Sequence, residues 1–378
     1  MLANLRPRSG RQATVTISIL AAVVWLLMIH WRRPATRTIH FHAFDRHLTS
    51  VDDISRLCAA HDFAPANPAS NTAGHKNQRR VYDLFSLSDE LDWLEIRLNT
   101  LHQYVDYFVI VESNRTLAGL PKPLHLQDHW FKFETFHRKI IYVPIGDAAN
   151  GSRIWDHEDA FRNALLYESL PQITGTKQEP RYGDALILSD TDEIPRPETV
   201  KLLRYCDFPD RLTLRSRLYY YSFQWLHRGE QWAHPQATVY HGLDDTISPA
   251  DLRNGEGGQS TGLFAAFRRA RQKTDLFDAA WHCSFCFRTI AEMQTKMQSF
   301  SQESWNTAEN RDPQNIINRV RNGLDLVNRE GEVYDKIDGN LDVPKFILQK
   351  WQDHRYLLNR DGPGAEFEDA KDLGVDGT

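Results

Sequence analysis

Short runs of β-favouring residues alternate with helical stretches through the first half of the chain. The runs cover residues 81–84, 107–111, 140–143 and 185–188, and a helical stretch over residues 155–170 precedes the last of them. A stripe of apolar residues after the first run predicts a further, amphipathic helix, formed by Leu91, Leu94, Leu98, Leu101 and Val105. Strands that alternate with helices favour right-handed βαβ crossovers. The sequence therefore predicts an α/β fold with a mostly parallel sheet flanked by helices.

Acidic residues directly follow the last of these runs. Asp190, Asp192 and Glu193 come after the apolar residues 185–188, and Pro197 then marks the first turn of a helix. Ligands of open α/β sheets bind beyond the carboxyl ends of the strands. Two carboxylates two residues apart can bind one hard divalent cation and bridge it to phosphate oxygens. Asp-x-Asp also arises by chance, and such acids can form a turn, but the strand and helix around them favour a metal–diphosphate site.

A long uncharged stretch lies near the N-terminus. Residues 14–31 contain no Asp, Glu, Lys or Arg, and as a helix they would extend about 27 Å, enough to cross a thin membrane. Trp31-Arg32-Arg33 follows in place of a small-residue cleavage site, which favours an uncleaved anchor over a signal peptide. Arginines flank the stretch on both sides, so the charges leave its orientation open.

These patterns divide the chain into five segments. Residues 32–80 lack periodicity and contain scattered prolines, which is typical of a stem, and their irregularly spaced histidines, His61 among them, are expected to be solvated. A helical pattern over residues 345–358 ends the folded part, and the tail is expected to be flexible. The expected segments are a tail at 1–13, an anchor at 14–31, a stem at 32–80, one catalytic domain at 81–360 and a flexible tail at 361–378.

Composition and motifs exclude several classes of partner. The net charge of −5 provides no broad positive field for nucleic acid. Neither G-x-G-x-x-G nor G-x-x-x-x-G-K-[ST] occurs, which excludes the dinucleotide-binding fingerprint and the P-loop. Cys58, Cys206, Cys283 and Cys286 are enough for one or two disulfides. Their pairing cannot be read from the sequence.

Residues 212–225 predict one long strand. Alternate residues on this strand share a face, and four of them are aromatic, at Tyr219, Tyr221, Phe223 and Trp225. Such a face either packs in a core or stacks on the apolar side of sugar rings. Both readings stay open.

Five sequence blocks together resemble glycosyltransferase family 17. The likeness runs from about Tyr82 to about Leu358. The blocks are Glu90-Leu-Asp92-Trp-Leu-Glu95-Ile-Arg97-Leu, Val109-Ile-Val-Glu112-Ser113-Asn114, Pro121-Lys122-Pro123-Leu, Leu188-Ser-Asp190-Thr-Asp192-Glu193-Ile-Pro195-Arg-Pro197 and Trp281-His282-Cys283-Ser284-Phe285-Cys286-Phe287.

This resemblance implies a GT-A-like fold and an inverting reaction. The implied donor is UDP-N-acetylglucosamine, the metal Mn²⁺ or Mg²⁺, and the acceptor a mannose hydroxyl of a glycoprotein N-glycan. The resemblance also implies a single-pass type II protein of the Golgi membrane with its catalytic domain in the lumen. There the sequons at Asn114 and Asn150 become possible glycosylation sites.

The resemblance also assigns roles at the acidic segment. Asp190 and Asp192 would bind the metal, and Asp190 would also contact the donor. Glu193 would support them in catalysis or cap the next helix. His282 would be a third metal ligand, because imidazole is common in mixed sites, or else an ordinary core histidine.

Further roles are implied outside the acidic segment. Glu112 and Ser113, at a strand end, would hold the nucleotide, although a strand-end acid can also form a turn. Arg162 would pair with phosphate, or lie on a helix surface. Asp278 would be the base that takes the proton of the attacking hydroxyl, or a surface acid.

Two other functions are compatible with the same residues. A phosphatase of the haloacid-dehalogenase type also uses Asp-x-Asp after an apolar strand, with the first Asp as nucleophile. Its motif disfavours Ile194, and about 100 folded residues precede Asp190 here. A non-catalytic glycan-binding protein would instead use the aromatic face between Tyr219 and Trp225.

Overall fold

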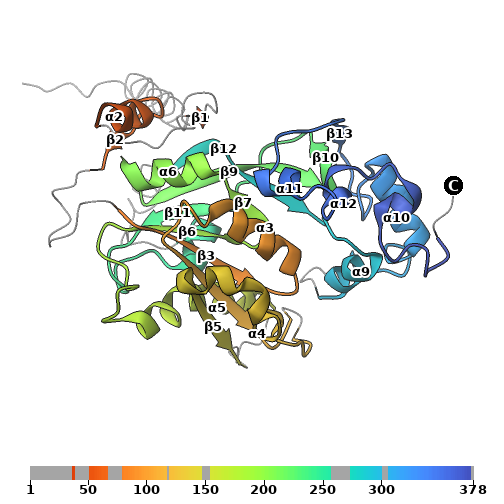
Figure 1. Ribbon diagram of the computed structural model, residues 1–378, viewed down its shortest axis with the longest axis horizontal. Helices are drawn as coiled ribbons and strands as arrows, with labels where there is room; N and C mark the ends of the chain where they lie inside the picture. Colours follow the sequence, from red (N-terminus) through yellow and green to blue (C-terminus); the bar gives the residue numbers. More distant parts are fainter. Residues whose placement is uncertain are drawn as a thin grey trace, which may run out of the picture. The chain divides into compact units, whose positions relative to one another are not determined.

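The computed structural model describes residues 36–38, 51–66, 79–116, 119–146, 154–256, 273–299 and 305–375 (Figure 1). The chain divides into two compact units, Met1–Thr36 and Arg37–Thr378. The anchor expected at residues 14–31 lies outside the described residues. Within them, no helix is long and apolar enough to span a membrane.

The second unit is built on a curled mixed sheet with the strand order β12-β9-β11-β6-β3-β4-β5. Strand β7 pairs with β12, β10 with β9, and β13 with β10. The bounds are β3 Val81–Leu87, β4 Tyr107–Ser113, β5 Ile140–Ile145, β6 Ala185–Asp190, β7 Glu193–Pro195, β9 Arg211–Tyr220, β10 Ser222–His227, β11 Gln236–Val239, β12 Lys273–Ser284 and β13 Tyr334–Lys336. Three short strands complete the set, β1 Thr36–Thr38, β2 Ala64–Pro65 and β8 Cys206–Asp207, and β2 pairs with β8.

Six strands of this sheet run in one direction. Strand β3 is parallel to β4 and β6, and β4 is parallel to β5. Strand β11 is antiparallel to both β6 and β9, so β9 runs with β6, and β12 is parallel to β9. The carboxyl ends of β3, β4, β5, β6, β9 and β12 therefore lie at one edge. The prediction of a mostly parallel sheet is confirmed for these six strands. The antiparallel strands β7, β10, β11 and β13 make the whole sheet mixed.

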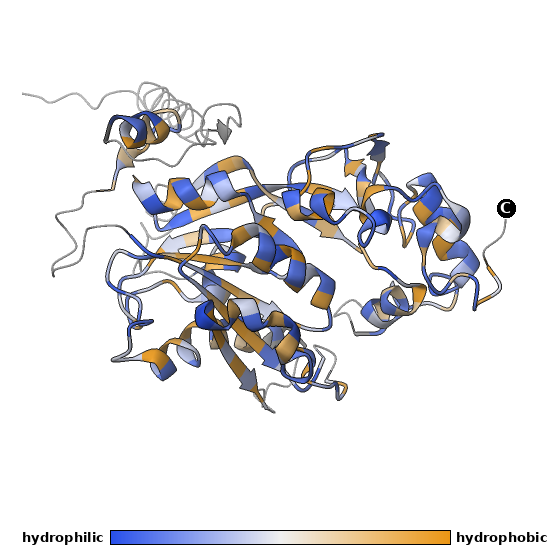
Figure 2. Ribbon diagram, viewed as in Figure 1, coloured by the Kyte–Doolittle hydropathy of each residue, from blue (hydrophilic) through white to orange (hydrophobic). Residues whose placement is uncertain are grey.

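Helices cover both faces of the sheet, which explains the continuous apolar runs of its central strands. In β6, Ala185 and Ile187 pack in a cluster with residues of α3 and α6, whereas Leu186 and Leu188 pack in another with residues of α5. Figure 2 shows these strands as the apolar centre of the fold. The helices are α2 Val51–Ala59, α3 Leu91–Leu101, α4 His125–Asp128, α5 Ile154–Tyr167, α6 Pro197–Tyr205, α7 Pro249–Asn254, α9 Ile290–Ser299, α10 Pro313–Asn322, α11 Lys345–Gln349 and α12 Arg355–Leu358, with 3-10 helices η2 Trp130–Lys139, η3 Leu170–Ile173 and η5 Pro363–Glu366.

The long strand expected at residues 212–225 is instead two strands. It breaks at Tyr221, whose φ of 64° places it in the left-handed region, and whose N–H donates to the carbonyl of Ser284. The break turns β10 away to pair with β13. Tyr219, Tyr221, Phe223 and Trp225 are all buried, so this aromatic set packs in the core.

Part of the expected stem is folded onto the sheet. Leu57 and Phe63 are buried in the main core. His61 is only 3% exposed, so the expectation that it is solvated was wrong. A disulfide joins Cys58 in α2 to Cys206 after α6. The segment from 51 to 66 is therefore part of the domain, because a covalent bond and apolar burial hold it there.

The C-terminal segment is also packed where flexibility was expected. Ala365, Phe367 and Ala370 are buried in a cluster with residues of α9 and α10. Arg360 is fully buried and donates to the carbonyls of Tyr221 and Ala365. These contacts extend the ordered domain beyond residue 360. The single helix expected over 345–358 is two short helices, α11 and α12.

Loss of the Cys58–Cys206 disulfide is expected to lower stability without touching the cavity described below. The bond closes a loop with a sequence separation of 148. Its removal raises the conformational entropy of the unfolded chain and lowers the free energy of unfolding by about 2–4 kcal/mol. Urea unfolding of Cys58→Ser/Cys206→Ser against the parent protein measures this. An unchanged midpoint would contradict the prediction.

Candidate active site

One cavity of about 750 Å³ follows the carboxyl edge of the sheet. Ser86 of β3, Ser113 of β4, Asp190 of β6, Tyr220 of β9 and Ser284 of β12 all line it. These are terminal or near-terminal residues of strands that run in one direction. The cavity therefore lies where α/β sheets bind ligands.

The acidic residues at the end of β6 have three different environments. Asp190 is 40% exposed, and Arg253 donates to its Oδ2 at 2.6 Å. The Asp192 side chain lines the cavity, and burial raises its pKa to about 6. Glu193 is fully buried and accepts from the Trp232 indole, the Asp190 backbone N–H and Arg253. Burial opposes the charge on Glu193, but the Arg253 guanidinium outweighs it and holds the Glu193 pKa well below its usual range.

A buried arginine holds the backbone of this acidic turn. Arg97 of α3 is fully buried and makes a bidentate ion pair with Asp83 at 2.6 and 2.8 Å. It also donates to the carbonyls of Asp190, Thr191 and Glu193, and to the Ser189 hydroxyl; the distances are 2.8, 3.3, 2.9 and 2.6 Å. A guanidinium has five N–H donors in a rigid fork, so one side chain can organise several turn carbonyls.

Sequence reasoning missed Arg97, although a signal was available. A charged residue stands directly before Leu98 within the apolar stripe of α3. Charged residues are almost never fully buried unless they are paired. That position indicates a buried partner, here Asp83, but not which backbone groups the fork reaches.

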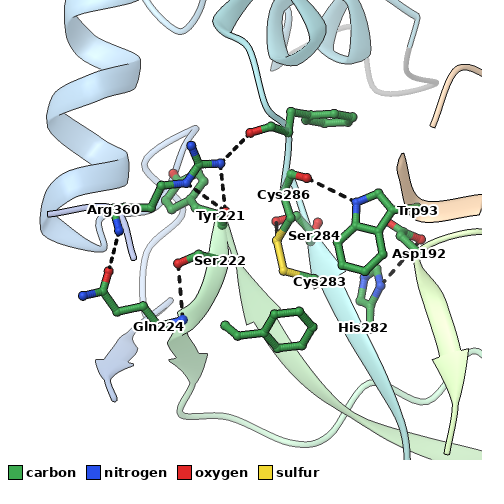
Figure 3. Close-up of a disulfide and its surroundings, with 12 residues drawn as sticks. Trp93, Asp192, Tyr221, Ser222, Gln224, His282, Cys283, Ser284, Cys286 and Arg360 are labelled. Carbon is green, nitrogen blue, oxygen red and sulfur yellow. Dashed lines mark hydrogen bonds and ion pairs between the residues drawn. A yellow bond between two sulfur atoms is a disulfide. The ribbon is translucent and has the colours of Figure 1, made fainter. Parts of the chain in front are cut away.

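His282 lies beside Asp192 on the neighbouring strand β12 (Figure 3). Its ring stacks on Trp232, with centroids 4.8 Å apart, and its Nδ1 lies 3.7 Å from Asp192 Oδ1. This Nδ1 is buried and makes no hydrogen bond to any residue that the structure describes. A buried imidazole nitrogen without a hydrogen bond, close to a carboxylate, fits a divalent-metal ligand pair.

Among the described residues, the fit to a metal site is limited to two side chains, those of Asp192 and His282. In the described part of the chain, no group of three or more His, Cys, Asp or Glu side chains is arranged to hold a metal ion. Asp190 is ion-paired with Arg253. Within the described part of the chain, Asp192 and His282 are the pair that would hold a cation.

The other expected site residues divide into two groups. Ser113 and Arg162 line the cavity, and Arg162 donates to Glu158 at 2.5 Å. Glu112 is fully buried outside the lining, where it accepts from the Tyr142 hydroxyl at 2.7 Å, and burial raises its pKa.

The expected base, Asp278, also lies outside the cavity lining. It accepts from Arg217 and from Gln231, each at 2.8 Å. The structure therefore does not bring Asp278 together with the other candidates. Among the described residues, the carboxylates that line the cavity are Glu90, Glu158, Asp190 and Asp192.

Comparison with known proteins identifies the family. The family model described as "Glycosyltransferase family 17" matches residues 13–247 and 259–363, which include Asp190, Asp192 and His282. The chain belongs to glycosyltransferase family 17. The resemblance expected from the sequence is thereby confirmed, and the family membership favours a glycosyltransferase over a phosphatase or a non-catalytic lectin.

Relatives and a solved structure add the following likenesses. The rat protein named β-1,4-mannosyl-glycoprotein 4-β-N-acetylglucosaminyltransferase is 27% identical over 74% of this chain, and its human counterpart is likewise 27% identical over 74%. The chain spans about half the length of these relatives, 54% and 55%. Glucosyl-3-phosphoglycerate synthase from Mycobacterium tuberculosis, solved with Mn²⁺, UDP and phosphoglyceric acid, aligns with 66% of this chain and 76% of its own at 12% identity. Its TM-score of 0.30 is too low to bear on this fold or site.

Proposed function

We propose that this protein transfers N-acetylglucosamine from UDP-N-acetylglucosamine to a mannose hydroxyl of a glycoprotein N-glycan, with inversion. The observation that carries the proposal is the Asp192–His282 pair at the carboxyl edge of the sheet, within the segments that match the family. The names of the relatives supply the donor sugar and the acceptor class.

The chain's own residues account for donor binding. Asp192 and His282 would hold Mn²⁺ or Mg²⁺, and the bound ion would neutralise charge on the leaving diphosphate. Two guanidinium groups, those of Arg162 and Arg253, line the cavity near Asp190, and each is ion-paired with a carboxylate. Charged donors aimed at a phosphate group in a partly buried site stabilise it more than they would in water.

Inversion in one displacement also requires a base for the attacking hydroxyl. The carboxylates of the cavity wall are candidates for this role, since a base must come within hydrogen-bonding reach of the proton it removes. Glu90 is paired with Lys296 at 2.7 Å and Glu158 with Arg162 at 2.5 Å. Each would act from within an ion pair.

We further propose a single-pass type II topology in the Golgi membrane. Residues 14–31 would form the anchor, residues 1–13 would face the cytoplasm, and the catalytic domain would be luminal. Two disulfides, Cys58–Cys206 and Cys283–Cys286, suit an oxidising compartment. Protection of the domain from protease in intact Golgi vesicles tests this topology, and cleavage without detergent would contradict it.

The activity is tested with the purified protein, manganese and a free N-glycan. UDP-N-acetylglucosamine is expected to release UDP and to add one N-acetylglucosamine to the glycan, and a chelator is expected to stop both. Other nucleotide sugars serve as controls. Release from another donor alone would refute the donor assignment, and no release from any donor would refute the transferase itself.

A further inference from the structure

The two halves of the cavity differ in chemistry. Strands β6 and β11 lie between β3 and β9 in the sheet, so the acidic turn after β6 separates the ends of β3, β4 and β5 from those of β9 and β12. The first half is lined by charged side chains of both signs, Arg115, Lys122, Arg162 and Arg253 together with Glu158 and Asp190. The second, here called the aromatic half, is lined by Tyr220, Phe285, Trp305, Arg329 and Tyr334.

Direct contacts join the members of the aromatic half. Tyr220 stacks on Tyr334 with centroids 4.5 Å apart and planes 7° apart, and it meets Phe285 edge-on at 5.7 Å. The Arg329 guanidinium lies 5.9 Å from the Tyr220 ring and 5.4 Å from the Trp305 ring. These distances are within cation–π range, so the rings and the guanidinium form one continuous wall.

A disulfide-closed turn holds one side of this wall (Figure 3). The bond joins Cys283 to Cys286, the Trp93 indole donates to the Cys286 carbonyl at 3.2 Å, and the Ser284 carbonyl accepts from the Tyr221 N–H at 2.9 Å. Phe285, inside the turn, has a φ of 53°. A bulky residue adopts a left-handed backbone only where surrounding contacts hold it in that conformation, and such residues concentrate at ligand sites.

The charge of the aromatic half suits a neutral ligand. Arg329 is paired with Asp325 at 2.6 Å, so the Asp325 carboxylate compensates the charge of the guanidinium. The Tyr334 hydroxyl donates to the same carboxylate at 3.1 Å. The Arg329 side chain is still 36% exposed, and Trp305 is partly exposed. The wall therefore offers an aromatic face and N–H donors from a guanidinium whose charge is compensated.

We propose that the aromatic half binds a saccharide ring of the accepting glycan, with Trp305 against the apolar face of the sugar and Arg329 donating to its hydroxyls. The acceptor role rests on the proposed function, whereas saccharide binding does not. Pyranose rings present C–H groups on one face and hydroxyls at the rim, which matches an aromatic ring beside a guanidinium.

The test compares Trp305→Leu with Trp305→Phe in the purified full chain. The leucine variant is expected to raise the KM for a free mannose-terminated N-glycan roughly tenfold, with the affinity for UDP within twofold of the parent. The phenylalanine variant is expected to retain most of the acceptor affinity. Trp351→Leu is the matched control, because Trp351 is 54% exposed and lies outside the cavity lining, and its KM should not change.

Calorimetric titration of the same free glycan, without nucleotide or metal, separates this inference from the proposed function. Binding that weakens about tenfold in Trp305→Leu supports the saccharide site, even if no donor yields transfer. An unchanged glycan KM and glycan affinity in Trp305→Leu would overturn the inference. A loss of UDP affinity larger than the loss of glycan affinity would also overturn it, since Trp305 would then stack on the nucleotide base.

Discussion

Asp192→Asn is expected to reduce N-acetylglucosamine transfer by roughly a thousandfold, because it removes several kcal/mol of metal-mediated charge stabilisation. The variant keeps the shape of the side chain and removes its charge beside His282. Manganese binding, measured by calorimetry, should weaken in parallel. A variant that retains normal turnover would remove Asp192 from the site.

Stability distinguishes this effect from misfolding. Burial raises the pKa of Asp192 to about 6, which means that the folded protein disfavours the charged form there. A neutral amide should therefore leave the unfolding temperature unchanged or slightly higher. Asp335→Asn is the control, since Asp335 pairs with Arg228 at the surface and its loss should affect neither activity nor manganese binding.

Arg97→Met is expected to lower the free energy of unfolding by about 3–5 kcal/mol, because it leaves the fully buried Asp83 carboxylate without its partner. The acidic turn loses its donor to the carbonyls of Asp190, Thr191 and Glu193 at the same time. Transfer should therefore fall further than the loss of folded protein explains. Urea unfolding and the rate per folded molecule measure the two effects.

Arg97→Lys tests whether Arg97 positions the turn or only neutralises Asp83. Lysine keeps the charge but lacks the planar fork, so we expect a lower kcat with most of the stability retained. The matched control is Arg79→Lys. Arg79 is also buried and donates to the carbonyls of Leu203 and Cys206, but it precedes β3 at the opposite edge of the sheet. An equal fall in kcat for both variants would contradict the positioning role.

The central strands and the main helices were predictable because their signals are local. Residues 185–188 form a continuous apolar run that only a strand covered on both faces explains, and the structure has β6 there. The apolar stripe from Leu91 became α3. The position of the acidic turn at a ligand-binding edge also followed, because parallel strands place their carboxyl ends together.

The antiparallel strand β11 and the break at Tyr221 were not predictable. Strand β11 is short and lies between β6 and β9, with which it pairs. Its placement depends on these partner strands, which the local sequence pattern does not identify. A left-handed backbone is uncommon for a bulky residue, and the local sequence does not mark Tyr221 for it. It depends on a hydrogen bond to Ser284, more than sixty residues away. Strand alternation therefore left open whether the four aromatic residues are buried, and it predicted the wrong backbone geometry.

The α/β class, the acids that end β6 and the glycosyltransferase family could be predicted from the amino-acid sequence, because each depends on neighbouring residues or on blocks of them. The three-dimensional fold was needed to show that Asp190 pairs with Arg253, that Asp192 faces His282, and that Arg97 donates to the carbonyls of the acidic turn. These contacts join residues 63 to 96 positions apart in the chain. Hydrogen bonds and ion pairs act over a few ångströms of space, so the fold must first bring their partners together.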